Sequence, residues 1–204
     1  MKVQMKSILA ILLLLSIKCI SQETIKTSVQ YGVKDIELQQ VLLFQNITIE
    51  TFTFEQEKIK NKSYQVFVKE YIKDSLVSKS LLFDGTETDY FKIKDNKLTF
   101  KIFAQVFDEE IKLQLTANGF SSAQKKFDLL QNSHNYAVKD FFGSNQFVEN
   151  PLNEEFALLA IITPTIRPDG SGSYCNVVQA NIKPEELGKH FNIPHYFLVT
   201  IKFI

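Results

Sequence analysis

The sequence is poor in the residues that cross-link a chain, kink it or form linkers between domains. Its 204 residues include no tryptophan, two cysteines, five prolines and seven glycines, and Arg167 is its only arginine. So few prolines and glycines leave no flexible linker between domains. The longest apolar block, residues 7–17, is shorter than the roughly 20 residues of a transmembrane helix. These shortages argue against a disulfide-rich scaffold and a chain of loosely joined modules, and they favour a cleaved segment over a retained membrane anchor.

The apolar block near the amino terminus has the flanking residues of a secretory signal peptide. Lys2 and Lys6 provide a basic start, and residues 7–17 match an apolar region of about 7 to 15 residues. Cys19 and Ser21 are small residues at the third-last and last positions before a cleavage site. We therefore expect cleavage after Ser21.

This cleavage would divide the chain into a signal peptide, residues 1–21, and a mature protein that begins at Gln22. The mature protein is expected to be secreted or periplasmic, with no stable membrane insertion after cleavage. Acylation of Cys19 is the alternative, and Lys18 argues against it because the residue before a lipidated cysteine has to be small. After cleavage at Ser21, Cys175 would be the only cysteine of the mature chain, so no intramolecular disulfide could form.

The charge balance gives no indication of a nucleic-acid partner, and none is expected. The chain has 23 basic and 23 acidic residues, and loss of the three lysines of the signal peptide leaves a net charge of −3. Proteins that bind nucleic acid need clustered positive charge to displace counterions. The lysines between residues 92 and 101 instead alternate with apolar residues, which is typical of the solvated face of a strand.

Alternating apolar and polar residues indicate that the mature chain is mainly β. Three stretches alternate on both sides of a turn pair and predict β-hairpins at residues 64–83, 91–102 and 111–129. Further strands are expected at residues 47–54, 156–162 and 196–203. Short helices are expected at residues 34–44 and after Pro184.

Many short strands with few helices favour an antiparallel β-sandwich of the immunoglobulin-like type, with one or two short helices. A parallel α/β sheet would need long crossover helices, which this pattern lacks. Residues 22–204 are therefore expected to form a single β-rich domain. Two small β domains divided near residue 132 are the alternative.

The most suggestive chemical cluster is formed by Cys175, His190 and His195. Thiolate and imidazole groups can bind zinc or act as a nucleophile and its base. Their spacing matches neither a Cys-x-x-Cys pair nor a His-Glu-x-x-His helix. We therefore predict no catalytic residues, no metal ligands and no cofactor, and the cluster supports only an alternative function.

The segment at residues 164–173 is predicted to be a long irregular loop because it holds two prolines and two glycines. It contains Arg167, and Tyr174 follows it directly. Arginine and tyrosine are enriched at binding hot spots, and sandwich loops often carry binding residues. Arg167 and Tyr174 are therefore our candidate ligand-binding residues.

The sequence is biased toward lysine, isoleucine and asparagine, and it contains characteristic short segments, among them Ser63–Tyr71 and Ile193–Phe197. In these features the chain resembles the uncharacterised secreted proteins of Bacteroidetes-type bacteria, which carry domains of unknown function. The resemblance implies export but neither an activity nor any site residue.

Two functions are compatible with these observations. The first is a secreted or periplasmic non-catalytic binding or accessory domain whose ligand is a protein, a peptide or a carbohydrate. The alternative is a hydrolase or metal-dependent enzyme that uses Cys175, His190 and His195. The absence of an assembled catalytic motif favours the binding domain over an enzyme.

Overall fold

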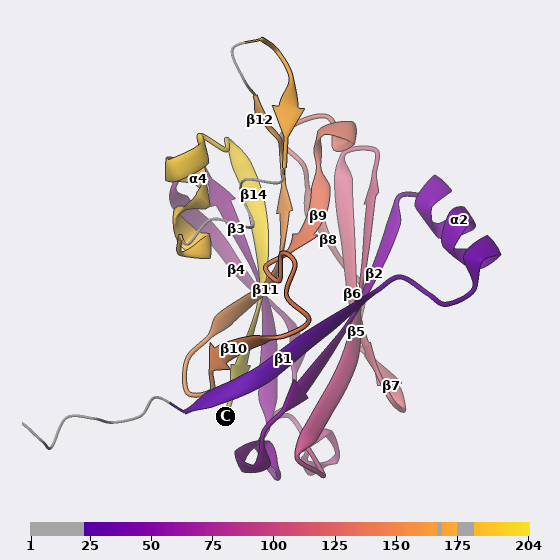
Figure 1. Ribbon diagram of the computed structural model, residues 1–204, viewed down its shortest axis with the longest axis vertical. Coiled ribbons are helices and arrows are strands. Elements are labelled where there is room, and N and C mark those ends of the chain that lie inside the picture. The colour runs from indigo at the N-terminus through magenta and orange to yellow at the C-terminus, as the bar shows by residue number, and fades with distance from the viewer. Residues whose placement is uncertain (1–22, 167–168, 175–181) are drawn as a thin grey trace, which may run out of the picture.

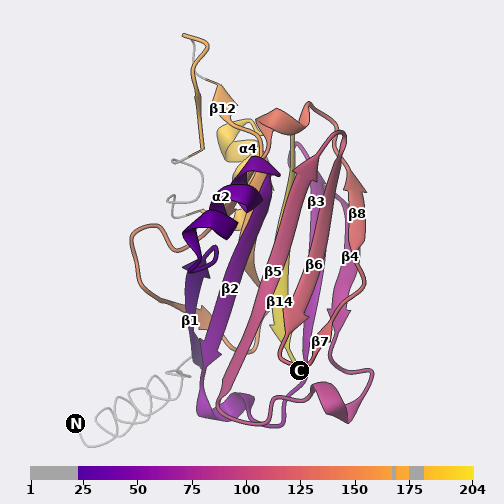
Figure 2. The same cartoon turned by 90° about the vertical axis from the view of Figure 1, so that its right-hand side faces the viewer.

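The computed structural model describes residues 23–166, 169–174 and 182–204. Two antiparallel sheets face each other across a hydrophobic core, as Figure 1 shows from their edges and Figure 2 after a quarter turn. The prediction of a mainly β, antiparallel sandwich with short helices is thereby confirmed. The predicted signal peptide, Arg167 and Cys175 lie outside the described residues.

The first sheet holds most of the amino-terminal strands. They are β1 (Thr24–Tyr31), β2 (Ile47–Glu55), β5 (Lys97–Phe107), β6 (Glu110–Ala117), β7 (Phe120–Ser121), β8 (Lys125–Asp128) and β10 (Val148–Pro151). Their order is β10-β1-β2-β5-β6-β7, and β8 also pairs with β6. Gly119 makes the turn after β6 with a φ of 89°, as expected for the predicted Asn-Gly turn.

The second sheet combines strands from both sides of residue 132. They are β3 (Tyr64–Ile72), β4 (Ser75–Asp84), β9 (Ala137–Asp140), β11 (Phe156–Ile162) and β14 (His195–Phe203), in the order β4-β3-β14-β11-β9. The carboxy-terminal strand β14 lies at the centre, where it pairs with β3 over nine residues. Its residues are buried on both faces except Lys202, in agreement with the predicted terminal strand.

The helices of the described residues are short and lie outside the sheets. They are α2 (Ile36–Phe44), α4 (Leu187–Phe191) and the single turns η2 (Glu57–Ile59), η3 (Asp89–Phe91), η4 (Ser133–Asn135) and η5 (Pro184–Glu186). Helix α2 and the helix after Pro184 were both predicted. No described helix has the length and apolar character needed to cross a membrane.

Aromatic side chains from both sheets form the core. The ring of Phe54 on β2 lies 5.4 Å from that of Phe100 on β5 and 5.6 Å from that of Phe203 on β14, measured between centroids. The Tyr64 ring of β3 stacks on Phe100 at 5.8 Å. Contacts of this kind contribute about 0.5 to 1.5 kcal/mol beyond the area that they bury.

The apolar residues of β2, Ile47, Ile49, Phe52 and Phe54, change phase near Glu50, a pattern that fits either a β-bulge or burial on both faces. Ile49 and Glu50 are adjacent in sequence and both are buried, although they point to opposite faces of the sheet. The pairing of β2 with β1 and with β5 is regular throughout. The shift therefore reflects burial on both faces rather than a β-bulge.

The predicted hairpin at residues 91–102 is wrong in its first half. Residues 89–91 form η3, which Thr88 caps, and β5 begins only at Lys97. Ile93 is buried, and its backbone exchanges hydrogen bonds with Asn61 and Lys62. The segment before β5 is thus held by the connection between β2 and β3, so it cannot pair with β5.

The predicted loop at residues 164–173 is also more regular than expected. Strands β12 (Thr165–Ile166) and β13 (Gly172–Ser173) form a short antiparallel ladder within it. Asp169 accepts hydrogen bonds from the backbone and hydroxyl of Ser171 at the turn, where Gly170 has a φ of 82°. This hairpin projects from one end of the sandwich in Figure 1.

Replacement of Phe54 by alanine tests the aromatic core. Phe54 is fully buried between four other aromatic rings, so Phe54→Ala is expected to lower the free energy of unfolding by about 3 to 5 kcal/mol. The matched control is Phe44→Ala, because Phe44 is 90% exposed. It should change stability by less than about 0.5 kcal/mol. Urea titrations compare the two variants, and equal losses would contradict this description of the core.

Candidate functional site

Helix α2 is the most unusual surface feature. The Oδ1 atom of Asp35 accepts a hydrogen bond of 3.0 Å from the backbone of Leu38 and so caps the first turn. The helix ends before Asn46, which takes the left-handed conformation with a φ of 54°. Local sequence therefore defines both ends of this helix, although none of its nine residues is buried.

The helix exposes an unusual amount of apolar surface. Five of its nine residues are exposed large hydrophobic side chains: Ile36, Leu38, Val41, Leu43 and Phe44. Elsewhere in the described chain such side chains occur singly or in pairs. In Figure 1 the helix stands away from the sandwich beside β2. A helix this apolar is normally covered by other structure, and contiguous exposed apolar surface marks interaction sites.

A groove of about 270 Å³ runs beside the carboxy-terminal end of α2. One wall comes from α2 and the start of β2, and the other from η4 and β9. The lining residues are Leu43, Asn46, Ile47, Thr48, Val106, Ser133, His134, Tyr136, Ala137 and Val138. Because Leu43 belongs to both features, the groove continues the apolar surface of the helix.

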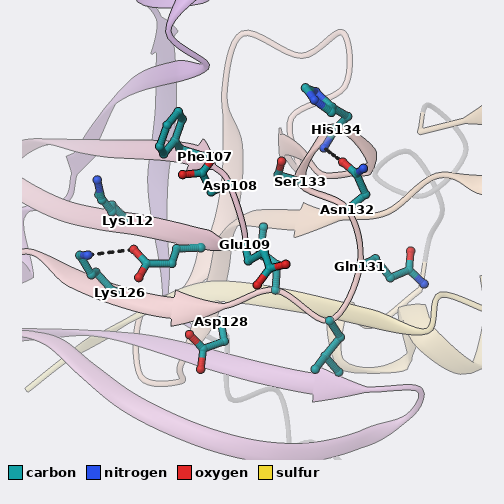
Figure 3. A pocket seen from close by; sticks show the side chains of 13 residues that line it. Phe107, Asp108, Glu109, Lys112, Lys126, Asp128, Gln131, Asn132, Ser133 and His134 are labelled. Atoms are coloured by element: carbon teal, nitrogen blue, oxygen red, sulfur yellow. Dashed lines mark hydrogen bonds and ion pairs between the residues drawn. The ribbon is translucent and has the colours of Figure 1, made fainter.

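A broader, open hollow of about 1130 Å³ lies between the end of β5, the start of β6 and the segment before η4 (Figure 3). Its lining is mostly polar, with the carboxylates of Asp108, Glu109, Glu110 and Asp128. Lys126 forms an ion pair of 2.9 Å with Glu110. Phe107 and Leu130 add exposed apolar surface at this hollow. This end of the sandwich is therefore both apolar and acidic.

His195 occupies a buried hydrogen-bond network at the start of β14. Its Nδ1 atom lies 2.5 Å from the Tyr136 hydroxyl and 3.4 Å from the backbone nitrogen of Leu130, and its Nε2 atom lies 3.2 Å from Glu70. Burial raises the pKa of Tyr136 to about 12, so its hydroxyl stays protonated and can donate to Nδ1. Nε2 then carries the ring proton, and this N–H group donates a hydrogen bond to Glu70.

The same burial lowers the pKa of His195, although Glu70 opposes this effect. The histidine is therefore neutral at neutral pH. Glu70 also accepts a hydrogen bond of 2.9 Å from Ser78, so the network joins β14, β3, β4 and the residue that precedes β9. Both ring nitrogens of His195 are engaged by neighbouring groups, which is the arrangement of a structural histidine.

The other predicted chemical residues do not join this network. His190 is an exposed residue of α4, and its ring contacts that of Phe191. No hydrogen bond or ring contact links it to His195 in the described part of the chain, and Cys175 is outside that part. The described residues also include no group of three side chains from the metal-binding types placed around one point.

Tyr174, a predicted ligand-binding residue, is half-buried. Its hydroxyl donates a hydrogen bond of 3.0 Å to the backbone oxygen of Asn135, and the Lys139 ammonium group lies 5.7 Å from its ring centroid. Tyr174 thus connects the β12–β13 hairpin to η4, at the same end of the molecule as the groove. Arg167, the other predicted residue, lies outside the described part of the chain.

Glu50 is a buried acid that the sequence analysis missed. It is only 3% exposed, and no hydrogen-bond partner for its Oε2 atom is present among the described residues. Burial raises its pKa to about 8; the negative charge of Asp140 adds to this shift and Lys139 opposes it. The sequence contained one indication that Glu50 is buried, since the alternation of apolar residues along β2 changes phase at this residue.

Stability measured against pH tests the buried state of Glu50. Its pKa is about 8 in the folded chain and 4.5 without the fold, so the folded state binds more protons between these pH values. The free energy of unfolding should therefore fall as pH rises through this window. Glu50→Gln, which cannot ionise, should be more stable than the original protein at pH 8 by about 1 to 3 kcal/mol.

The control for this measurement is Glu87→Gln, because Glu87 is exposed. Its denaturation curve should match that of the original protein from pH 5 to pH 8. If Glu50→Gln were destabilised at pH 8, Glu50 would be ionised and stabilised by a partner in the fold.

No family model, curated protein or solved structure matches this chain. Its function is therefore inferred from the side chains at this end of the sandwich.

Proposed function

We propose that the chain is an exported, non-catalytic binding domain that recognises a protein partner through α2. Export follows from the predicted signal peptide of residues 1–21. The main observation in support of a binding function is the apolar surface of α2, which nothing in the described structure covers. The partner would supply an apolar groove that accepts this helix.

The spacing of the exposed side chains supports recognition as a helix. Leu38, Val41 and Phe44 follow one another at intervals of three residues, which places them along one side of the helix. Helices that bind in grooves use anchors at such intervals. Full burial of one side chain of this size contributes about 1.5 to 3 kcal/mol, so a few anchors suffice for binding.

The chemistry of this surface favours a protein over other ligands. Four of the five exposed side chains are aliphatic, and aliphatic groups provide no hydrogen bonds for a carbohydrate. The charged residues at the start of the helix are Lys34, Asp35 and Glu37, and the nearby hollow is acidic. A partner with basic residues around its apolar groove would complement both features.

The alternative enzyme function has less support. It needs His195 as a base or a metal ligand, but Tyr136, Leu130 and Glu70 already occupy both ring nitrogens. Either role would require these buried hydrogen bonds to break, which is costly in the interior of a protein. The binding function requires no such rearrangement.

Capture experiments with α2 variants test this function. The double variant Leu43→Gln, Phe44→Gln keeps good helix formers and changes only exposed positions, so its melting temperature should stay within about 2 °C. Capture of partners from extracts of the native host, identified by mass spectrometry, should fall at least tenfold if these side chains contribute about 1.4 kcal/mol or more.

The control is Leu76→Thr, Val77→Thr, which removes two exposed apolar side chains from β4. This variant should capture the same partners as the original protein. Unchanged capture by the α2 variant, or equal loss in both variants, would overturn the assignment of α2 as the binding surface. Gel filtration of the purified protein shows whether the partner is a second copy of the chain.

A further inference from the structure

Another cavity, of about 310 Å³, lies beside β7 at the end of the sandwich away from α2 (Figure 1). Its walls come from η3, the segment between η3 and β5, the first residues of β5 and the turn that joins β6 to β7. Ligand pockets have volumes of about 300 to 1000 Å³, so this cavity can hold one small molecule or one residue of a polymer.

Aromatic rings form the apolar part of the cavity. The rings of Phe91 and Phe120 lie 4.8 Å apart between centroids, and both pack on the buried ring of Phe83, at 5.1 and 5.0 Å. Tyr90 contacts Phe91 at 5.6 Å, yet 59% of Tyr90 is exposed. Its hydroxyl lies against Gly119, since a Cβ atom added there would be 2.9 Å away. The core thus fixes two rings of the cavity, and η3 presents a third ring to solvent.

Tyr64 adds a polar group from the side of the core. The residue is 1% exposed, and its ring packs on Phe83 at 5.1 Å and on Phe100 at 5.8 Å. Its hydroxyl has no hydrogen-bond partner among the described residues, and it is not one of their atoms that are fully shielded from solvent. Burial raises the pKa of Tyr64 well above its usual value, so the hydroxyl stays protonated. A ligand in the cavity would satisfy this group, which is costly to leave unpaired.

Charged groups surround the same cavity. Three lysines and one aspartate give its lining a net charge of +2: Lys92, Lys94, Lys97 and Asp95. Lys92 and Lys97 form ion pairs of 2.7 and 3.2 Å with Asp89 and Glu55, two acids outside the cavity. Lys94 forms no ion pair with the described residues, and its ammonium group lies 5.9 Å from the centroid of the exposed tyrosine ring. Lys94 is therefore available to an anionic group of a ligand.

These groups together fit one residue of an acidic sugar. A sugar ring has an apolar face of C–H groups, which packs on an aromatic ring, and hydroxyl groups around its edge. The hydroxyl of Tyr64, the amide of Asn118 and the carboxylate of Asp95 are hydrogen-bond partners for such hydroxyls. The carboxylate of a uronic acid would pair with Lys94. An apolar ligand would leave these polar groups unpaired, and a protein partner needs a much larger surface than this cavity.

We propose that this cavity binds a uronic acid residue of an acidic carbohydrate: the sugar ring packs on Tyr90, and its carboxylate pairs with Lys94. The cavity shares no residue with α2 or with the groove beside it. It therefore binds a sugar whether or not the helix binds a protein. With both sites, the chain would hold a protein at one end of the sandwich and a polysaccharide at the other.

Titration of the purified protein with defined oligosaccharides, followed by NMR spectroscopy, tests this site. The probes are trimers of galacturonate, mannuronate and guluronate, and the neutral trimer galactotriose. At least one acidic trimer should shift the backbone signals of residues 118–120, bind about tenfold more tightly than galactotriose or better, and lose affinity as salt is added. No binding of any acidic trimer, or equal binding of galactotriose, would overturn the proposal.

Substitutions in the cavity locate the bound sugar. Lys94→Gln and Tyr90→Ala change exposed side chains, and each should weaken binding of the acidic trimer by about fivefold or more, because they remove the cation and the exposed ring. Tyr64→Phe keeps the buried ring and removes one hydrogen bond, so it should weaken binding by about two- to tenfold.

A ring and a cation with the same geometry at the opposite end of the sandwich provide the matched control. The ammonium group of Lys112 lies 5.9 Å from the centroid of the Phe107 ring, and neither residue lines this cavity. Lys112→Gln and Phe107→Ala should bind the acidic trimer like the original protein. Unchanged binding by Lys94→Gln and Tyr90→Ala, or equal loss in the control variants, would contradict a sugar site in this cavity. None of these results bears on capture by α2, so the two proposals fail separately.

Discussion

The rest of the structure depends on the contact between aromatic side chains of the two sheets. Phe54 touches rings from β2, β5, β11 and β14, so one side chain connects strands that are far apart in the sequence. The predicted mature chain has a single cysteine and cannot add an internal disulfide, so this packing has to stabilise the sandwich. These ring contacts join the two sheets without any contribution from α2, none of whose residues is buried.

The core becomes polar at the end of the sandwich near α2. Glu50 is buried on the inward face of β2 with Phe52, and the network of Tyr136, His195 and Glu70 crosses the second sheet. Buried polar groups of this kind cost stability unless they are fully paired. Both ring nitrogens of His195 have partners, whereas the Oε2 atom of Glu50 has none among the described residues.

The sequence predicted which segments form strands better than it predicted which strands pair with each other. Period-two patterns identified β2, β3, β4 and β6. A continuous apolar run identified β11, and aromatic and β-branched residues identified β14, because both of these strands are buried on both faces. Strands β1, β9 and β10 were missed, since β9 and β10 have four residues each and little alternation. The pairing of β5 was assigned to the wrong neighbour because Ile93 takes its hydrogen bonds from a distant turn.

The candidate site was harder to predict than the fold. Helix α2 was expected from the absence of glycine and proline, but a sequence does not show that a tertiary structure leaves all nine residues uncovered. A site-specific photo-crosslinker at Phe44, compared with one at Leu76, tests the binding role of α2 most directly in the native host. We expect one discrete protein adduct from position 44 and none from position 76. No adduct at 44, or the same adduct from both positions, would contradict this account of the molecule.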